Sequence, residues 1–319
     1  MTLKTKEIAH ELQTDIDPTK HVDVQRFDKL VNRCVAVATT AFNTPAGNYT
    51  DFERWHFAQI FTSMRHSHRS VRNLAAKGCD NPESVDSLVI ARAQVECVFT
   101  VYLLLEKPEM LTVFLKDSWK KKYIRYLIER HECRKLPRFR EFLDEKAVPL
   151  LEGLRQLLKI SDEEKQTIAA ELLGTAPPAS GPKPIRLFPT PKRVLNQIAS
   201  PEKKAVLARL YPEYAWLCSF VHGSPESTLN KCMFDKRSKY FDLFSSGQRE
   251  DAWRKEVGQK AVLLSVLSVA VCTAELVELY PADVELRGAA GVAWGELADF
   301  SLLAQSLWHR RLKKLLQVL

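Results

Sequence analysis

Apolar residues in this chain recur every three or four positions, which is the spacing that predicts amphipathic helices. One such stripe consists of Phe27, Leu30, Val31, Cys34 and Val35. Strand signals are scarce, and the 319 residues include only 11 glycines and 16 prolines. A β-sandwich or a Rossmann-type α/β enzyme needs many more turn residues than this. We therefore expect an all-α protein, folded as an irregular multi-helix bundle.

The expected organisation is one helical domain that follows a short N-terminal segment, residues 1–23. We expect the halves 24–173 and 192–319 to pack together, joined by residues 174–191, where six prolines predict an exposed linker or insertion. A loop is expected around Pro137, followed by two shorter helices up to about residue 173. The longer helices are expected over 24–42, 52–77, 82–107, 110–130, 207–221, 251–280 and 292–316.

Basic residues exceed acidic ones, 47 against 39, giving a formal net charge of +8. The excess is concentrated in residues 109–140, which hold ten Lys or Arg against four Asp or Glu. Such a stretch is either a solvated helix face with a basic loop or a surface that binds phosphates. The candidate nucleic-acid-binding residues are Lys120, Lys121, Lys122, Arg125 and Arg130.

The seven cysteines are dispersed and form no C-x-x-C pair, and the N-terminus is too polar for a secretory signal. Both features predict a cytoplasmic location. The longest uncharged apolar run, 261–274, has 14 residues, whereas a membrane-spanning helix needs about 20. We therefore expect a buried core helix there and no transmembrane segment. The terminal stretch LWHRRLKKLLQVL predicts a packed amphipathic helix, with a membrane-surface or partner-binding helix as the alternative.

Residues 65–72 combine arginines and histidines on one expected helix. Helical spacing places Arg65, Arg69 and Arg72 on one face, while His66 and His68 point in divergent directions. Two divergent histidines cannot bind the same metal ion on a straight helix. We expect neither a metal nor a cofactor.

Two further patterns place polar groups on apolar helices. Arg92 and Glu96 are one turn apart within the apolar stretch IARAQVECVFTVYLLLE, where a charged pair is costly unless it is hydrogen-bonded. Tyr214, Cys218 and His222 recur every four residues, so they share a helix face. The ion pair is either a structural pair near the rim or part of a functional pocket, and His222 is either a helix cap or a proton donor.

Together these positions resemble a widespread bacterial family of all-helical proteins known as a domain of unknown function. The resemblance covers about residues 52–280 and depends on Arg92, Glu96, Tyr214 and His222. Cys218 stands where the pattern has serine, although Ser219 is adjacent. The resemblance implies that both halves of the chain fold together around a shared polar centre.

Two functions remain open. The first is a binding or interaction module in which the Arg/Glu/Tyr/His centre is a buried network, with RNA, another phosphate-containing ligand or a protein as the partner. The alternative is a metal-independent ribonuclease or phosphodiesterase, an effector in a defence or toxin setting. It would use His222 as general acid/base, Arg69 or Arg92 on the phosphate, and Glu96 to orient the arginine. Arg125 and His131 also fit the loose Arg-x4–6-His spacing of HEPN-type nucleases.

Overall fold

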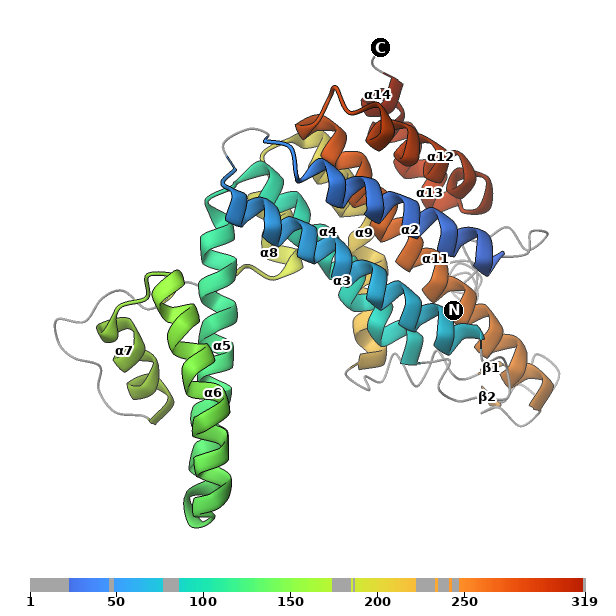
Figure 1. Ribbon diagram of the computed structural model, residues 1–319. Helices are drawn as coiled ribbons and strands as arrows, with labels where there is room; N and C mark the ends of the chain where they lie inside the picture. The colour runs from blue at the N-terminus through green and yellow to red at the C-terminus, as the bar shows by residue number, and fades with distance from the viewer. Residues whose placement is uncertain are drawn as a thin grey trace. The chain divides into compact units, whose positions relative to one another are not determined.

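The computed structural model describes residues 23–45, 49–76, 86–173, 185, 187–221, 233–234, 241–242 and 247–317. Within this part of the chain the fold is all-α, as the sequence predicts (Figure 1). The only strands described are β1 (Met233–Phe234) and β2 (Phe241–Asp242), which form a minimal antiparallel pair. Most of the Pro-rich segment lies outside the described residues, and residues 187–190 are not helical.

The chain divides into two compact units. Unit 1 comprises residues 1–105 and 191–319, and unit 2 comprises residues 106–190. This division differs from the expected halves 24–173 and 192–319, because residues 106–173 belong to a unit of their own. The expectation of one domain over 24–319 stays a prediction.

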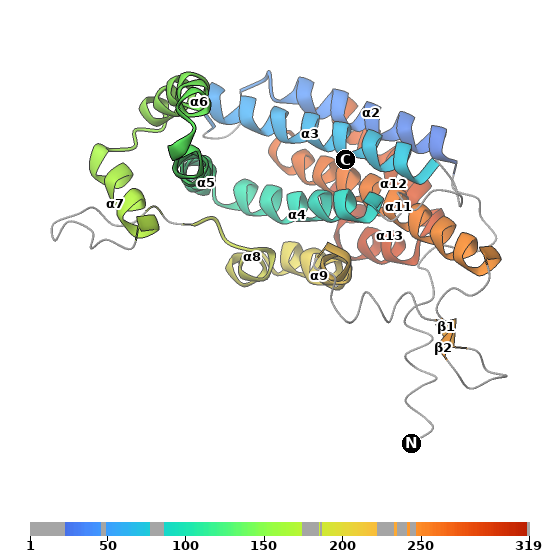
Figure 2. The ribbon, with the colours of Figure 1, turned by 90° about the horizontal axis from the view of Figure 1, so that it is seen from below.

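Unit 1 is built around a long apolar helix, α11 (Gly247–Leu279). This helix packs against α2, α3 and α12, and α2 also contacts α3 and α12 (Figures 1 and 2). The other described helices of the unit are α2 (Val24–Ala41), α3 (Asp51–Ala76), α4 (Asp86–Glu106), α8 (Pro191–Gln197), α9 (Pro201–Val221), α12 (Val284–Phe300), α13 (Leu302–Leu307), the π-helical turn η3 (Trp308–Leu312) and α14 (Lys313–Gln317).

Side-chain caps and prolines fix several helix ends in unit 1. Asp23 accepts hydrogen bonds from the backbone N–H groups of Gln25 and Arg26, both at 3.0 Å, and so begins α2. The helix α4 ends at Glu106, two residues before Pro108, which cannot continue a helix. The expected helix over 292–316 is wrong in its bounds, because Ser301 is extended and caps a new helix by accepting from Ala304 N at 3.2 Å.

Gly258 permits the close approach of α11 to α3. A Cβ atom at this position would lie 3.3 Å from Cβ of Ala75, which is tighter than ordinary van der Waals contact. A glycine at this point of α11 therefore lets the two helices pack with their backbones close together.

Two helices in the described residues are long and apolar enough to cross a membrane by length and composition. In Val257–Leu279, 89% of the apolar window is buried inside the fold, and in Asp86–Glu106 the figure is 56%. Core helices meet the same criterion, so these two are weak evidence for membrane spans. Residues 261–274, expected to form a core helix, lie in the more deeply buried of the two.

Unit 2 consists of α5 (Met110–Glu132), the 3-10 turn η2 (Cys133–Lys135), α6 (Pro137–Leu157) and α7 (Asp162–Leu173). α5 and α6 form an antiparallel hairpin, with Pro137 in the first turn of α6. A reciprocal cap begins α7: Ser161 N donates to Glu164 Oε2 at 2.8 Å, and Glu164 N donates to Ser161 Oγ at 3.1 Å. The core of unit 2 includes Trp119, Leu151, Ile160 and Ile168, which are buried.

Candidate functional site

The structure brings three of the predicted site residues together between α4 and α9, along with Cys218. Arg92 donates from Nη2 to the Tyr214 hydroxyl at 2.9 Å and from Nε to Cys218 Sγ at 3.3 Å. Its Nη2 also lies 3.2 Å from Oε2 of Glu96, one turn along α4. These four residues form what we call the α4–α9 cluster. Positions 122 residues apart in the chain thus meet as the sequence pattern predicts.

The α4–α9 cluster lies at the edge of the core of unit 1. The Arg92 side chain is 24% exposed and that of Glu96 is 40% exposed. Burial raises the pKa of Tyr214 to about 12, aided by its hydrogen bond with Cys218 and by the charge of Glu96. Burial opposes the charge of Arg92, but its contacts with Cys218, Glu96 and Tyr214 raise the pKa of the guanidinium. The cluster is therefore a cation held in place by a neutral phenol, a thiol and a carboxylate.

The remaining predicted members are placed differently. Arg69 is exposed on α3 and makes no hydrogen bond or ion pair with the described α4–α9 cluster, so of the two alternatives, Arg69 or Arg92, only Arg92 lies beside Glu96, and a role for Arg69 stays a prediction. His222 lies outside the described residues, which in α9 end at Val221. The Ser219 hydroxyl donates to the backbone oxygen of Trp216 at 2.7 Å, so Cys218, not Ser219, faces the arginine.

The two histidines of α3 diverge as helical spacing requires. His66 is exposed, whereas His68 is buried and its Nδ1 lies 2.8 Å from the Ser265 hydroxyl. Burial lowers the pKa of His68 to about 4. Across the described residues, no group of three or more His, Cys, Asp or Glu side chains is placed to hold a metal ion.

The predicted nucleic-acid-binding residues do not share a surface. Lys120 is buried and its Nζ lies 3.1 Å from Oε2 of Glu171 on α7, so its expected place on an exposed surface is wrong. The reason is the helical period: Lys120 lies on the side of α5 that faces α7, whereas Lys121, Lys122 and Arg125 lie on the opposite side and are exposed. Arg130 lies near the first side and pairs with Asp144.

Ion pairs also engage two of the three residues on this exposed side, Lys121 and Arg125. Lys121 lies 2.8 Å from Asp117, and Arg125 lies 2.7 Å from Glu129, each one turn away on α5. His131 contacts Arg134, not Arg125, because its Nε2 lies 2.7 Å from Nη1 of Arg134. The HEPN-like spacing therefore brings no arginine–histidine pair of that pattern together.

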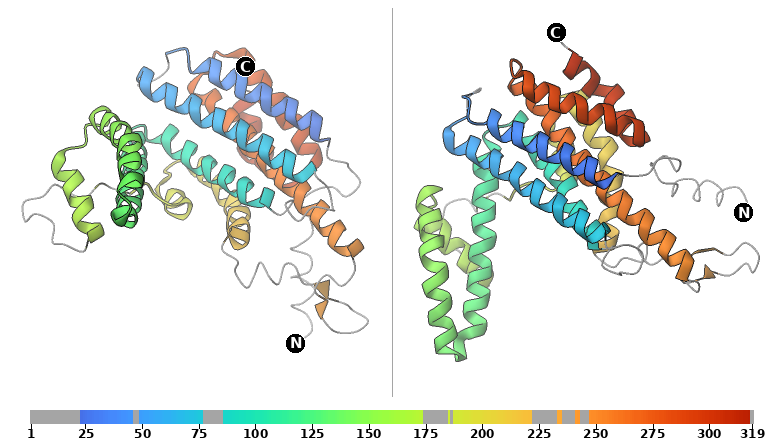
Figure 3. Two further views of the ribbon diagram at one scale, coloured as in Figure 1. Left: turned by 60° about the horizontal axis from the view of Figure 1, so that its bottom comes forward. Right: turned by 45° about the vertical axis from the view of Figure 1, so that its right-hand side comes forward.

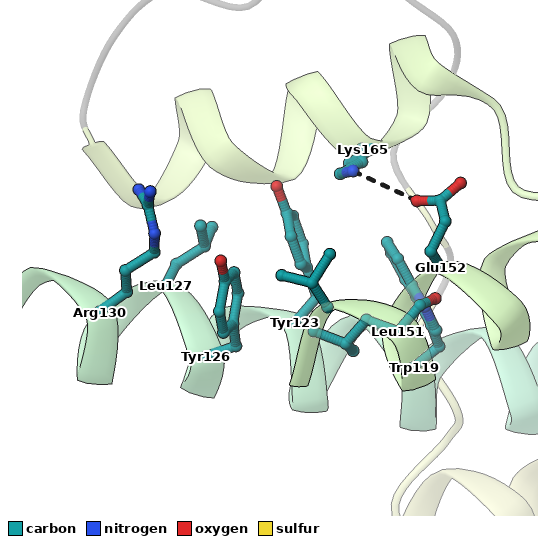
Figure 4. A pocket seen from close by; sticks show the side chains of 9 residues that line it. Trp119, Tyr123, Tyr126, Leu127, Arg130, Leu151, Glu152 and Lys165 are labelled. Carbon is teal, nitrogen blue, oxygen red and sulfur yellow. Dashed lines mark hydrogen bonds and ion pairs between the residues drawn. The ribbon is translucent and has the colours of Figure 1, made fainter. Parts of the chain in front are cut away.

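A cavity of about 310 Å³ lies in unit 2, and sequence reasoning missed it. Figure 4 shows three aromatic rings of α5 pointing into it, with a cation near each end. The rings are nearly parallel: Trp119 and Tyr123 have centroids 5.0 Å apart at 17°, and Tyr123 and Tyr126 have centroids 6.3 Å apart at 24°. The cavity is lined by Trp119, Tyr123, Tyr126, Leu127, Arg130, Val148, Leu151, Glu152 and Lys165.

Hydrogen bonds hold two of the three rings. The Trp119 indole donates to the backbone oxygen of Leu151 at 2.9 Å, and the Tyr126 hydroxyl donates to Asp144 Oδ1 at 2.8 Å. The Tyr123 hydroxyl makes no hydrogen bond within the part of the chain that the structure describes. Burial raises the pKa of Tyr123, so its hydroxyl stays protonated and able to donate to a ligand.

The two cations of the cavity are only partly engaged. Arg130 uses Nε toward both oxygens of Asp144, at 3.0 and 3.2 Å, and its two terminal nitrogens make no hydrogen bond among the described residues. Lys165 Nζ lies 3.5 Å from Glu152 and 5.8 Å from the centroid of the Tyr123 ring. The spacing of Trp119, Tyr123 and Tyr126 at four and three residues is the sequence signal that marks this aromatic face.

A second polar network, also missed from the sequence, is buried in unit 1. Arg311 donates to both oxygens of Glu275, from Nε at 2.6 Å and from Nη2 at 2.9 Å, and Tyr102 donates to the same carboxylate at 2.8 Å. Both charged side chains are almost fully buried. Arg311 lies in the π-helical turn η3, so the expected packed terminal helix presents one of its arginines to the core.

Comparison with known proteins finds no match among curated proteins and none among solved structures. A protein-family model described as a family of unknown function, DUF5677, matches residues 55–240. The matched region is more than half of the chain and contains both the α4–α9 cluster and the cavity of unit 2. The resemblance to a family of unknown function is thereby confirmed, and the chain belongs to the DUF5677 family.

Proposed function

We propose that this protein is a helical binding module whose ligand site is the cavity of unit 2. The observation that carries the proposal is the combination of a row of aromatic rings with a free donor edge of Arg130 at one end. Ligand sites are mostly apolar, with a few polar groups that fix orientation, and about 300 Å³ is the lower end of their volumes. The ligand class is therefore a small planar molecule with an anionic group.

The lining residues support binding more than catalysis. None of the nine is a serine, cysteine or histidine, and the unpaired Tyr123 hydroxyl is suited to donate a hydrogen bond. Arg130 and Lys165 outnumber Glu152 among the charged groups, which favours an anion. Because the Arg130 side chain is 44% exposed, the aromatic row shields its attraction for such an anion from water on one side only.

Binding of 2-naphthoate, measured by titration calorimetry, tests this proposal, with uncharged 2-naphthol as the comparison. We expect 2-naphthoate to bind more tightly and Leu127→Trp, which fills the cavity, to abolish binding of both. Arg130→Gln should remove the preference for the anion. Arg125→Gln is the matched control, because it removes the same charge from an exposed position on α5. Equal binding by wild type and Leu127→Trp would refute the proposed site.

In this proposal the α4–α9 cluster has a structural role. Hydrogen bonds from one guanidinium to two side chains of α9 fix the register of α4 against α9. Glu96→Gln and His222→Ala should then lower the melting temperature without changing the affinity for 2-naphthoate. The five described cysteines are free thiols, which supports the further proposal of a cytoplasmic location.

The second candidate function is a metal-independent phosphodiesterase or ribonuclease centred on Arg92. The observation that favours it is the convergence of Arg92, Glu96 and Tyr214 at a partly exposed position. Nη1 of Arg92 makes no hydrogen bond among the described residues. His222 would supply the general acid/base. Incubation with single-stranded RNA in the presence of EDTA tests this: cleavage that His222→Ala abolishes supports it, and cleavage that His222→Ala leaves unchanged refutes this mechanism.

A further inference from the structure

The turn between α5 and α6 combines exposed apolar side chains with unpaired cations. We call residues 133–142 the hairpin tip. Leu136 is 53% exposed, Phe139 65% and Phe142 59%. Large apolar side chains that gather at an exposed position, rather than occurring singly, mark an interaction surface.

The hairpin tip is also strongly basic. It contains four cations, Arg134, Lys135, Arg138 and Arg140, and one acidic residue, Glu141, so its formal charge is +3. All four cations are exposed, and none forms an ion pair with an acidic side chain in the described ranges. Elsewhere on α5 the exposed cations Lys121 and Arg125 pair with acids of their own helix. The described part of unit 2 therefore has its largest group of exposed, unpaired cations at the hairpin tip, beside single ones such as Lys122 on α5.

No other described element of unit 2 covers these side chains. α7 packs along the part of the α5–α6 hairpin that is away from the turn, as Figure 1 and the right panel of Figure 3 both show. The buried core of unit 2 also lies away from the turn, since it includes Trp119 and Leu151 but no residue of the hairpin tip. The exposed phenylalanines are thus not part of the packing of this unit.

We propose that the hairpin tip inserts into the interface of an anionic lipid surface. Segments that bind this way place aromatic and aliphatic side chains at the boundary between headgroups and acyl chains, and place Lys and Arg at the level of the lipid phosphates. Phe139, Phe142 and Leu136 supply the first group, and the four cations supply the second. Arg138 and Arg140 flank Phe139 in sequence, so their long side chains can reach phosphates on both sides of the inserted ring.

A lipid surface fits these residues better than single-stranded RNA does. RNA-binding surfaces stack bases on aromatic rings within a basic groove. Here one of the three apolar side chains, Leu136, is aliphatic and offers no ring on which a base can stack. Two of the three exposed cations of α5 that would extend such a groove, Lys121 and Arg125, are already paired, which leaves Lys122 alone.

Sedimentation of the full-length protein with vesicles tests the proposal. One vesicle contains phosphatidylcholine alone, and the other contains one part phosphatidylglycerol to three parts phosphatidylcholine. We expect binding to the anionic vesicle only, weakened by added salt because the attraction is electrostatic. Each cation near an anionic surface adds to the electrostatic attraction between protein and lipid. Removing two of them in Arg138→Gln/Arg140→Gln should weaken partitioning by about thirtyfold. Phe139→Ala/Phe142→Ala should weaken it by about tenfold or more.

Matched controls separate the hairpin tip from general charge and apolarity. Lys29→Gln/Arg33→Gln removes two exposed charges from α2, and Val284→Ala/Leu302→Ala removes two equally exposed apolar side chains from α12 and α13. Neither control should change binding. All the substituted positions are exposed, and circular dichroism before and after substitution verifies that the helices persist.

Three results would overturn the proposal. One is that the wild-type protein stays in the supernatant with both vesicles, and another is that it binds both equally. The third is that the control variants lose as much binding as the tip variants. A fluorescent single-stranded RNA is added in a parallel titration. If RNA binds and vesicles do not, and the tip variants abolish RNA binding, the hairpin tip is a nucleic-acid surface instead.

Discussion

Acidification from pH 7 to pH 5 should destabilise this protein through His68. The imidazole is 1% exposed, with Ser265 at Nδ1 and Asp28 Oδ1 3.9 Å from Nε2. Burial lowers its pKa from 6.5 to about 4, and the nearby charges of Asp28 and Arg72 act in opposite directions. The folded protein therefore keeps His68 neutral at a pH at which the unfolded chain has already protonated it.

The sign and size of the effect follow from proton linkage. Well above pH 6.5 neither state binds the proton, so His68 contributes no pH dependence to the free energy of unfolding there. Between pH 6.5 and 4 the unfolded state binds more protons than the folded state, and the free energy of unfolding falls as the pH falls. With pKa values of 6.5 unfolded and about 4 folded, the loss between pH 7 and pH 5 is about 2 kcal/mol.

Urea unfolding at a series of pH values, followed by circular dichroism, measures this loss. His68→Gln retains an amide that can bond Ser265 but does not titrate, so its stability should fall by about 2 kcal/mol less than that of the wild type over this range. His66→Gln, at an exposed position two residues away, is the control and should follow the wild-type curve. Parallel curves for wild type and His68→Gln would refute the reasoning.

Three further substitutions and one control test the packing of unit 1 by the same urea assay. Arg311→Ala should cost about 3–5 kcal/mol because it leaves the buried charge of Glu275 without its cationic partner. Glu202→Ala, which removes an exposed partner of the same arginine, should cost less than about 1 kcal/mol, and similar losses would contradict this account. Gly258→Val should cost about 1–3 kcal/mol by forcing α11 away from α3, and a neutral result would show that the helices have room to separate. Tyr214→Phe should cost about 1 kcal/mol, the net value of one hydrogen bond, and a stabilised variant would contradict a structural role for the α4–α9 cluster.

Helical periodicity predicted the elements well because their ends are encoded locally. α2 begins beside the cap Asp23, and α4 ends two residues before Pro108. The loop expected around Pro137 is wrong, because Pro137 is the first residue of α6. The break at Ser301 was missed because a serine within an apolar helical pattern has two outcomes, a hydrogen bond inside a continuous helix or a cap on a new one. The choice between them depends on packing against the rest of unit 1, which the local pattern does not contain.

The α4–α9 cluster was predictable for a different reason. Arg92 and Glu96 interrupt an apolar helix, and a charge in such a place needs a partner. Tyr214 and Cys218 are four residues apart, so they form a polar face on a second helix that can hydrogen-bond the arginine. The position of Lys120 was not predicted, because counting charges along residues 109–140 ignores the angle between neighbours. Three consecutive lysines point in three directions around α5, and only the helical angle separates the buried one from the exposed ones.

The aromatic face of α5 could also have been recognised from the helical angle between residues. Trp119, Tyr123 and Tyr126 lie on the inward side of the basic stretch, so the segment that was interpreted as a solvated helix face or a phosphate-binding surface also lines a cavity. Exposed cations without acidic partners lie mainly at the hairpin tip, in η2 and the first turn of α6. Binding of an aromatic anion in the cavity and of anionic lipid at the tip are therefore separable properties: Leu127→Trp should abolish the first alone, and Arg138→Gln/Arg140→Gln should weaken the second alone. If either variant abolished both aromatic-anion binding and lipid binding, the two sites would depend on each other through the structure of the hairpin.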